Sequence, residues 1–393
     1  MHAQVIREER FGPPASAFMV EEVDVPEIGD DECLVAVMAA GINYNGIWAS
    51  AGAPVNVIRL HRKLGEGDFH IGGSDGSGIV YKVGRDVHDV AVGDAVIMHG
   101  GWWDRSCPHI RAGGDPMLSP TCKMWGYETS YGSFAQFTRV KRDQVIAKPP
   151  ALTWEEGAAF LGNGAAAYRG MHGFAEHTVR AGDVVLVWGG AGGLGSLAIQ
   201  VARAAGAIPI GVVSDAQKAE YCLAHGAKGV IDRTRFDHWG TMPRWDDTAA
   251  YARWNAGARA FGEAIWEAVG ARRNPRIVFE HPGEATLPTS LYVCDTGGMV
   301  VICAGTTGYQ VTFDLRYHWM RQKRFQGTHY ANREQAVAMT ELVGSGRVDP
   351  CLGRTFEFTA IGAAHQLMAD RKAPHGNMVA LVGAREPGGG RRA

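Results

Sequence analysis

The sequence has no strong excess of either charge and no long apolar run. Its 39 Lys and Arg against 41 Asp and Glu give a formal net charge of −2, whereas nucleic-acid and membrane-surface binders normally carry a basic excess. No apolar run approaches the ~20 residues that a membrane-spanning helix needs, and the first residues lack the apolar core of a secretory signal. We therefore expect a cytoplasmic protein that binds neither nucleic acid nor membranes.

Paired cysteines are also missing. The seven cysteines are scattered and odd in number, and they include no Cys-x-x-Cys motif, so we expect reduced thiols rather than a disulfide framework or a four-cysteine zinc site. A catalytic zinc would require a Cys/His/Cys-type ligand set. Cys107 and Cys122 with His99 and His109 do not have that spacing, and the sequence predicts a site without a metal.

What the chain does have is length and glycine. Its 393 residues, 53 of them glycine, exceed what one hydrophobic core supports. The first 150 residues indicate short strands and turns, whereas from Val184 onward strands alternate with helices, as in a parallel sheet covered on both faces. We expect a mainly β catalytic domain from residues 1–162 and 330–393, ending in a disordered tail. A doubly wound α/β domain at residues 163–329 is inserted into it.

A glycine-rich turn follows the apolar run 184–188 and precedes a helical segment. Glycines at such a turn let the backbone approach a pyrophosphate, and the N–H groups of the helix start point at it. A purely structural tight turn is the alternative. The strand–turn–helix context favours dinucleotide binding, and the residues predicted to contact the cofactor are Gly189, Ala191, Gly192, Gly193 and Leu194.

The end of the second strand discriminates NAD from NADP, because an acidic side chain there binds the ribose 2′-hydroxyl and a basic or hydroxyl cluster accepts a 2′-phosphate. Ser214, Lys218 and Arg233 favour the phosphate. Asp215 argues against it, since an inward carboxylate would repel that group. We predict NADPH as the cofactor; the alternative for Lys218 is a solvated helix residue.

Several segments closely resemble the crotonyl-CoA carboxylase/reductases, which belong to the enoyl-CoA carboxylase/reductase group of the medium-chain dehydrogenase/reductase superfamily. The resemblance extends from about residue 20 to residue 382 and implies a Rossmann cofactor domain beside a GroES-like catalytic domain. It also implies a homodimer or a dimer of dimers. The segments are INYNGIWAS (42–50), GGSDGSG (72–78), GGDPMLSP (113–120), WGYETSYGSFAQFTRV (125–140), FEHPGEAT (279–286), VICAGTTG (301–308), WMRQKR (319–324), GTHYAN (327–332) and VDPCL (348–352).

The resemblance implies a reaction. NADPH would give a hydride to the β-carbon of an α,β-unsaturated acyl-CoA, and the resulting enolate would attack carbon dioxide to give an alkylmalonyl-CoA. If a proton arrives first, the product is the saturated acyl-CoA. The main alternative is therefore a plain NADPH-dependent enoyl-CoA reductase, and a non-catalytic NADPH-binding protein is a third reading. The sequence does not fix the length of the acyl chain.

By the same resemblance, four residues would control carboxylation. Asn45 would donate its amide to carbon dioxide, Tyr127 would exclude bulk water, Glu128 would position an ordered water, and His329 would complete the hydrogen-bonding set. Three of them have an ordinary alternative: Asn45 as a turn or cap residue, Glu128 as a solvated loop carboxylate, and His329 as a satisfied edge-strand histidine.

Two further points concern the nicotinamide end of the cofactor. Ala304, Gly305 and Thr306 follow the strand expected beside the nicotinamide, where their backbone groups would hold its carboxamide. Glu280 and His281 are expected to shape this pocket rather than transfer protons. Many superfamily sequences have Thr-Ala-Tyr-Arg near the nicotinamide, whereas this chain has Ala166 in place of the threonine. That departure leaves room for the plain reductase.

Overall fold

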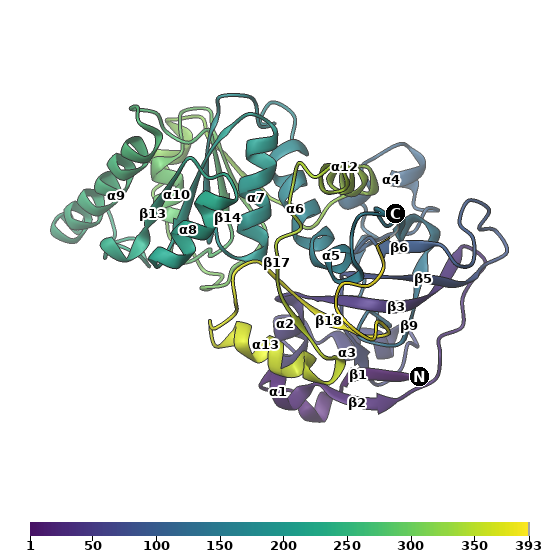
Figure 1. The fold of residues 1–393 in the computed structure, drawn as a ribbon. Helices are drawn as coiled ribbons and strands as arrows, with labels where there is room; N and C mark the ends of the chain where they lie inside the picture. The colour runs from purple at the N-terminus through teal and green to yellow at the C-terminus, as the bar shows by residue number, and fades with distance from the viewer. Residues whose placement is uncertain (392–393) are drawn as a thin grey trace. The chain divides into compact units, whose positions relative to one another are not determined.

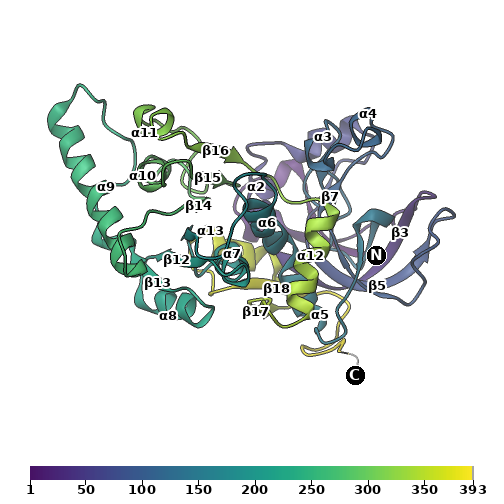
Figure 2. The same ribbon diagram turned by 90° about the horizontal axis from the view of Figure 1, so that it is seen from above.

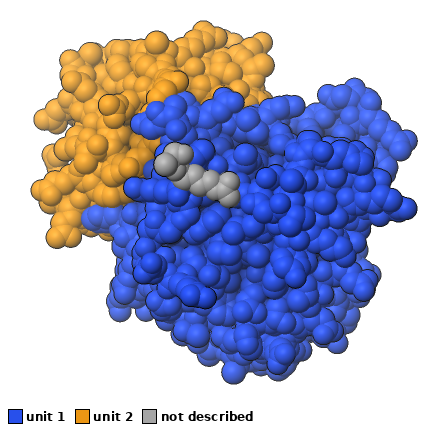
Figure 3. Space-filling model, turned by 45° about the vertical axis from the view of Figure 1, so that its right-hand side comes forward, with its two compact units in different colours: residues 1–165, 330–346, 350–393 blue, residues 166–329, 347–349 orange. Residues whose placement is uncertain are grey.

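The computed structural model describes residues 1–391 as two compact units (Figure 3). Unit 2 consists of Ala166–His329 and Arg347–Asp349, and the remaining described residues form unit 1. The sequence places the domain boundaries at 162/163 and 329/330, whereas the units divide after Ala165 and after His329. The first division falls inside a continuous helix, α6 (Leu161–His172), so no loop marks it. In the described part of the chain, no helix is both long and apolar enough to cross a membrane.

Unit 2 is built on a six-stranded parallel sheet with the order β13-β12-β11-β14-β15-β16 (Figure 1). The first strand of unit 2, β11, lies at the centre of the sheet. The next two strands extend the sheet to one edge, and the last three form its other half. This is the doubly wound order of dinucleotide-binding sheets, and it confirms the fold expected from the sequence. The strands are β11 (Val184–Trp188), β12 (Ile208–Val213), β13 (Gly229–Asp232), β14 (Ile277–Glu280), β15 (Met299–Ile302) and β16 (Arg324–Gly327).

Helices cover both faces of this sheet (Figure 2). The helices α7 (Gly193–Ala204) and α8 (Ala216–Ala224) lie on one face, and α9 (Thr248–Val269) and α10 (Leu287–Val293) lie on the other. The polar and aromatic sequence of residues 237–259 predicts only an addition to the connection between two strands. In the structure, α9 begins within this segment. Its buried residues Phe261 and Ile265 pack on the sheet.

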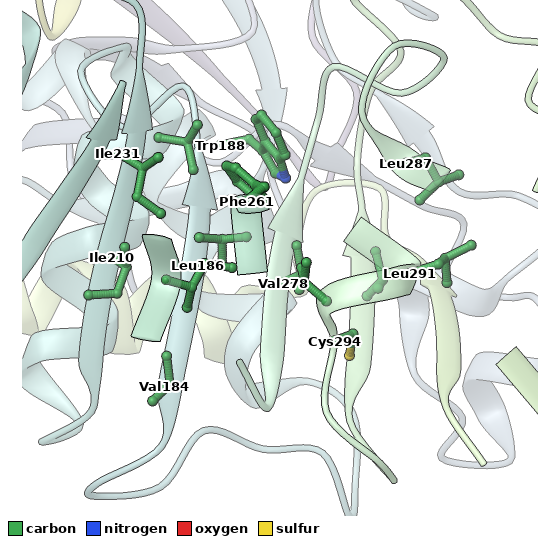
Figure 4. Packing of buried hydrophobic residues seen from close by; sticks show 14 residues of the cluster. Val184, Leu186, Trp188, Ile210, Ile231, Phe261, Val278, Leu287, Leu291 and Cys294 are labelled. Atoms are coloured by element: carbon green, nitrogen blue, oxygen red, sulfur yellow. The ribbon is translucent and has the colours of Figure 1, made fainter. Parts of the chain in front are cut away.

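The core of unit 2 lies between the sheet and α9 (Figure 4). Phe261 stacks on Trp188 with their ring centroids 5.5 Å apart. The Trp188 indole N–H donates to Ser290 Oγ at 2.8 Å, which satisfies the only polar atom of that buried side chain. The end of β11 is thereby fixed from one face of the sheet, directly before the glycine-rich turn.

Unit 1 is mainly β, and its largest sheet has the order β10-β6-β5-β3-β18-β17, with β9 also pairing with β3. The C-terminal strand β18 lies between β3 and β17, so the chain returns after unit 2 to complete a sheet begun near the N-terminus. A second sheet has the order β2-β1-β4. The strands are β1 (His2–Ile6), β2 (Met19–Glu22), β3 (Glu32–Ile42), β4 (His70–Ile71), β5 (Gly76–Val83), β6 (Ala95–Met98), β7 (Gly101–Trp102), β8 (Lys123–Met124), β9 (Phe137–Lys141), β10 (Val145–Ala147), β17 (Leu352–Phe356) and β18 (Asn377–Leu381).

Short helices connect these strands, and one of them, α5, starts with a capping box, which the spacing of Thr153 and Glu156 in the sequence predicts. Thr153 Oγ1 accepts from Glu156 N at 3.1 Å, and Glu156 Oε2 accepts from Thr153 N at 2.7 Å. The remaining helices are α1 (Pro14–Ala17), α2 (Asn45–Ala51), α3 (Val57–Lys63), α4 (Pro108–Arg111), α5 (Trp154–Ala159), α11 (Arg316–Trp319), α12 (Arg333–Gly344) and α13 (Ile361–Ala369).

The expected disorder of the tail does not hold for residues 388–391. Gly389 O accepts from Trp154 N at 2.9 Å, and Arg391 forms an ion pair of 3.0 Å with Glu156. Gly390 lies so close to the Trp154 ring that a Cβ there would be 2.7 Å from it. Because glycine has no Cβ, the tail can pack directly against Trp154. Residues 392–393 lie outside the described part of the chain.

Removing the cap of α5 should destabilise unit 1. We expect Thr153→Ala to lower the free energy of unfolding by about 1 kcal/mol, because the first turn of α5 loses a hydrogen-bond acceptor. Differential scanning calorimetry would measure this as a lower melting temperature. Thr153→Ser keeps the oxygen and serves as the control; equal destabilisation by both substitutions would contradict the capping role.

Candidate active site

The glycine-rich turn follows β11 and opens directly into α7. Gly189 adopts a φ of +57°, and Gly192 is the N-cap of α7, whose start no side chain of the described residues caps. A Cβ at Gly195 would lie 2.3 Å from Gly189 O, so this position requires glycine. An uncapped helix start with close backbone packing matches the needs of a pyrophosphate, and the residues present therefore fit a dinucleotide.

The turn is fixed from the next strand of the sheet. His281, directly after β14, donates through Nε2 to Trp188 O at 2.9 Å. A Cβ at Gly189 would lie 2.6 Å from that same nitrogen. Burial lowers the pKa of His281, so the ring is held neutral as a hydrogen-bond donor. This agrees with a shaping role for His281.

The residues expected at the 2′-phosphate lie at the carboxyl ends of neighbouring strands. Val213 pairs with Asp232, so Ser214 and Arg233 follow directly paired positions. Lys218 Nζ donates to Ser214 Oγ at 2.9 Å and lies 2.7 Å from Asp215 Oδ2. The structure therefore brings Ser214 and Lys218 into contact and places Arg233 at the next strand end.

Asp215 has a local task that the sequence argument missed. Its Oδ1 accepts from Lys218 N at 2.9 Å and caps α8. The hydrogen bond from Lys218 lowers the pKa of Asp215 to about 2. The carboxylate that argued against a 2′-phosphate is thus a helix cap paired with a lysine, a use that its position before a helix could have indicated.

Two loops at the carboxyl ends of β14 and β15 lie side by side. Thr306 N donates to His281 O at 3.2 Å, and Gly283 and Gly308 form an isolated bridge. The segment expected to hold the nicotinamide carboxamide, Ala304–Thr306, is thereby attached to the loop after β14.

Glu280 holds the loop that follows β14 through hydrogen bonds. This buried carboxylate accepts hydrogen bonds from Gly283 N, Thr286 Oγ1 and Ser290 Oγ at 3.1, 2.7 and 2.5 Å. Desolvation raises its pKa to about 7. With its oxygens engaged inside the protein, Glu280 is a structural anchor.

In unit 1, Asn45 is the first residue of α2. Its Nδ2 donates to Ser74 Oγ at 3.4 Å. One turn later, Trp48 contacts the Tyr44 ring at 5.2 Å and the Tyr127 ring at 6.4 Å between centroids. Asn45 and the loop that carries Tyr127 therefore lie in the same region of unit 1, joined by an aromatic cluster that the sequence did not reveal.

Tyr127 and Glu128 belong to a closed loop. Tyr127 is buried. Glu128 N donates to Met124 O at 2.8 Å, and Glu128 Oε2 accepts from Met124 N at 2.8 Å. The half-buried carboxylate is held by its own loop rather than freely solvated, which is the arrangement that positioning a water would require.

His329 is the last residue of its segment of unit 2 and lies two residues after β16. The next residue, Tyr330, belongs to unit 1 and has a φ of +60°. Its buried hydroxyl accepts from Gly100 N at 2.9 Å. The structure thus groups Asn45, Tyr127 and Glu128 in one unit and assigns His329 to the other, and the complete four-residue set stays a prediction.

Sequence reasoning missed the buried network beneath Asn45. Asp75 accepts from Asn43 Nδ2 at 2.8 Å and from Gly162 N at 2.6 Å. Asn163 Nδ2 donates to both Asn43 Oδ1 and Asn377 Oδ1, at 3.0 and 2.8 Å. Desolvation raises the pKa of Asp75 to about 7. The sequence shows only a lone carboxylate among the glycines of residues 72–78, and nothing near it identifies its distant partners.

The side chains considered for zinc have local partners. His109 Nε2 donates to Asp115 O at 3.0 Å, Ser119 donates to Cys107 Sγ at 3.4 Å, and His99 Nδ1 accepts from Gly101 N at 2.8 Å. Among the described residues these histidines and cysteines form no cluster of three potential ligands. A metal-independent site remains a proposal.

Comparisons with known proteins identify the family to which this chain belongs. Residues 29–150 match the family model described as "Alcohol dehydrogenase GroES-like domain", and residues 193–345 match the one described as "Zinc-binding dehydrogenase". The chain is 49% identical over 388 residues to the "Crotonyl-CoA carboxylase/reductase" of Cereibacter sphaeroides, a match that covers 99% of this chain and 89% of that protein. The chain belongs to the crotonyl-CoA carboxylase/reductase family.

Other members of this family agree. The "Crotonyl-CoA reductase" of Streptomyces collinus is 38% identical over 368 residues, 91% of this chain and 80% of that protein. The structure of crotonyl-CoA carboxylase/reductase AntE in complex with NADP has a TM-score of 0.95 at 52% identity, covering 98% of this chain and 95% of that one. A 2-octenoyl-CoA carboxylase reductase, CinF, in complex with NADP and 2-octenoyl-CoA, has a TM-score of 0.90 at 33% identity, covering 99% and 89%. The GroES-like and Rossmann combination expected for the family is confirmed.

The lysine beside Ser214 should determine cofactor preference. We expect Lys218→Ala to raise the Michaelis constant for NADPH roughly ten- to hundredfold, because a charge-assisted hydrogen bond is lost and Asp215 loses its counter-ion. The constant for NADH should change little. Steady-state kinetics with both cofactors measure this. Lys228→Ala, at an exposed lysine before the opposite end of β13, is the control; an unchanged NADPH constant would remove Lys218 from the site.

The buried carboxylate of Asp75 should leave a pH signature. Because its pKa is raised from near 4 to about 7, the folded protein binds more protons than the unfolded chain over that range. Asp75 therefore reduces stability as the pH rises from about 4 to about 7, by at most about 1.4 kcal/mol per pH unit. Melting temperatures of the wild type and Asp75→Asn, compared from pH 5 to 8, isolate this contribution. Parallel pH profiles would contradict it.

Proposed function

We propose that this protein catalyses the NADPH-dependent reductive carboxylation of an α,β-unsaturated acyl-CoA, crotonyl-CoA or a longer homologue. The observation that carries the proposal is the 49% identity to a crotonyl-CoA carboxylase/reductase over 99% of the chain. The amide and carboxylate that the reaction would use, Asn45 and Glu128, are held by hydrogen bonds in unit 1.

The chemistry divides between a reduction and a carboxylation. NADPH, when bound, supplies the hydride that the β-carbon of the thioester receives. The electron pair of the double bond moves to the α-carbon as an enolate, and this carbon forms a new bond to carbon dioxide. The product is an alkylmalonyl-CoA with one new carboxylate. If the α-carbon takes a proton instead, the product is the saturated acyl-CoA.

The proposed residues favour carbon dioxide over the proton. The Asn45 amide is a neutral donor that can hold an oxygen of carbon dioxide without protonating the enolate readily. Tyr127, packed against Trp48, would exclude bulk water. Glu128 would hold a water against the gas, and His329 would complete the hydrogen-bonding set. A fixed array of such dipoles stabilises developing charge without reorganisation.

Further parts of the proposal concern binding. The turn from Gly189 to Leu194 would hold the pyrophosphate, the cluster of Ser214, Lys218 and Arg233 the 2′-phosphate, and the backbone of Ala304–Thr306 the nicotinamide carboxamide. No metal takes part in this proposal. We propose further that the protein acts in the cytoplasm as a homodimer or a dimer of dimers.

A plain enoyl-CoA reductase is the second candidate. One relative, at 38% identity, carries the name "Crotonyl-CoA reductase", and Ala166 lacks the hydroxyl that many superfamily members carry near the nicotinamide. The two candidates differ only in what reaches the α-carbon, and the products therefore distinguish them.

The deciding experiment is product analysis by mass spectrometry. The protein is incubated with crotonyl-CoA, NADPH and isotopically labelled bicarbonate, with carbonic anhydrase to supply carbon dioxide. A labelled ethylmalonyl-CoA supports the carboxylase. Butyryl-CoA alone at saturating bicarbonate would identify a plain reductase on this substrate.

The carboxylation residues should separate the two outcomes within one enzyme. We expect Glu128→Ala and His329→Asn to lower the carboxylated fraction of product more than the rate of NADPH oxidation, because hydride transfer does not need the ordered water. Product ratios and NADPH absorbance measure the two effects. Glu341→Ala and His88→Asn, both at exposed positions, are the controls. An equal loss of both activities would contradict the assigned roles.

A further inference from the structure

Asn45, which is proposed to bind carbon dioxide, lies close in the chain to a buried network of hydrogen-bonded side chains. Asn43 lies two residues before Asn45, and Asp75 accepts a hydrogen bond from its side chain at 2.8 Å. The same carboxylate accepts from Gly162 N at 2.6 Å, just inside the start of α6. Cβ atoms at Gly41 and Gly162 would lie 2.6 and 2.4 Å from Asp75 atoms. The network is therefore closely packed, and the backbone that leads to Asn45 has little freedom.

Ser74 connects this network to Asn45 directly. It precedes Asp75 in the chain, is 6% exposed, and its Oγ accepts the hydrogen bond from Asn45 Nδ2 at 3.4 Å. A hydrogen bond from Gly41 N to Asp75 O, at 3.1 Å, ties the backbone of the segment to the end of β3. The hydroxyl thus belongs to the residue directly before one whose backbone is hydrogen-bonded to β3.

A side-chain amide has two N–H groups that lie in one plane. When one of them is held by Ser74, the plane of the amide is fixed and the direction of the second N–H follows. Without that partner, the amide can rotate about its terminal torsion, which is broad for asparagine. Orientation of a donor matters because a hydrogen bond weakens steeply away from linearity.

We infer that Ser74 is a positioning residue for carboxylation: its hydroxyl oxygen holds one N–H of the Asn45 amide and so directs the other toward carbon dioxide. The inference rests on the proposed function and extends it to a residue that does not itself touch the substrate. Asp75 supports Ser74 by anchoring the segment to Asn43 and Gly162. Two neighbouring residues of the glycine-rich segment 72–78 thereby gain distinct tasks.

The test is the substitution Ser74→Ala, with products measured from crotonyl-CoA, NADPH and labelled bicarbonate. We expect the ratio of carboxylated to saturated product to fall roughly three- to tenfold, the value of one neutral hydrogen bond. The rate of NADPH oxidation should fall less than this ratio. The Michaelis constant for carbon dioxide should rise, a change that a merely structural defect would not cause selectively.

Ser77→Ala is the matched control. Ser77 lies in the same segment, is also buried, and its hydroxyl donates to Trp154 O at 2.5 Å, away from Asn45. We expect its product ratio to equal that of the wild type. If Ser74→Ala gives the same ratio as Ser77→Ala while the wild type carboxylates, the inference about Ser74 is wrong and the proposed function stands. If the wild type itself incorporates no label, the proposed function fails first.

A double-mutant cycle tests whether Ser74 acts through Asn45. In an Asn45→Ala background the amide is absent, so adding Ser74→Ala should leave the product ratio unchanged, and the two effects should be strongly non-additive. Additive effects would show that Ser74 influences carboxylation by another route and would overturn the positioning role.

Discussion

The hydrogen bonds that the buried Asp75 carboxylate accepts from Asn43 and Gly162 connect the segments from which unit 1 builds its candidate site. A carboxylate removed from water is costly unless its oxygens are paired, so the end of β3, the segment 72–78 and the start of α6 must meet for unit 1 to fold. The donors that satisfy Asp75 are the same groups that fix the approach to Asn45. The stability of unit 1 and the orientation of Asn45 therefore both depend on the hydrogen bonds to Asp75.

Unit 2 repeats the device with Glu280. There the buried carboxylate stands at the end of a central strand and holds the loop after β14 through Gly283, Thr286 and Ser290. Ser290 Oγ also accepts a hydrogen bond from the Trp188 indole N–H, so hydrogen bonds connect Glu280 to the strand that ends at the glycine-rich turn. In both units, therefore, a buried carboxylate accepts hydrogen bonds from several loop residues and holds that loop in place.

Local features of the sequence predicted unit 2 well. The strands at 184–188 and 208–213 are continuous apolar runs bounded by turn residues, and the structure has them at these positions. The capping box at Thr153 is also a local signal. The Asp75 network was not predictable in this way, because its members are distant in sequence; Asn163 and Asn377 are 214 positions apart. The helix α9 was missed since aromatic and polar residues mix along it, and its apolar face appears only once the sheet is in place.

The paired state of Asp215 has an evolutionary consequence. In dinucleotide-binding sheets, a free acidic side chain after the second strand marks proteins that use the cofactor without the 2′-phosphate. Here the acid is present but neutralised by the lysine three residues later, while its other oxygen caps α8. On the proposed assignment, cofactor choice is set by a counter-ion rather than by the absence of an acid. A lineage could then weaken its preference for the 2′-phosphate by losing a single cation, with the helix cap intact throughout.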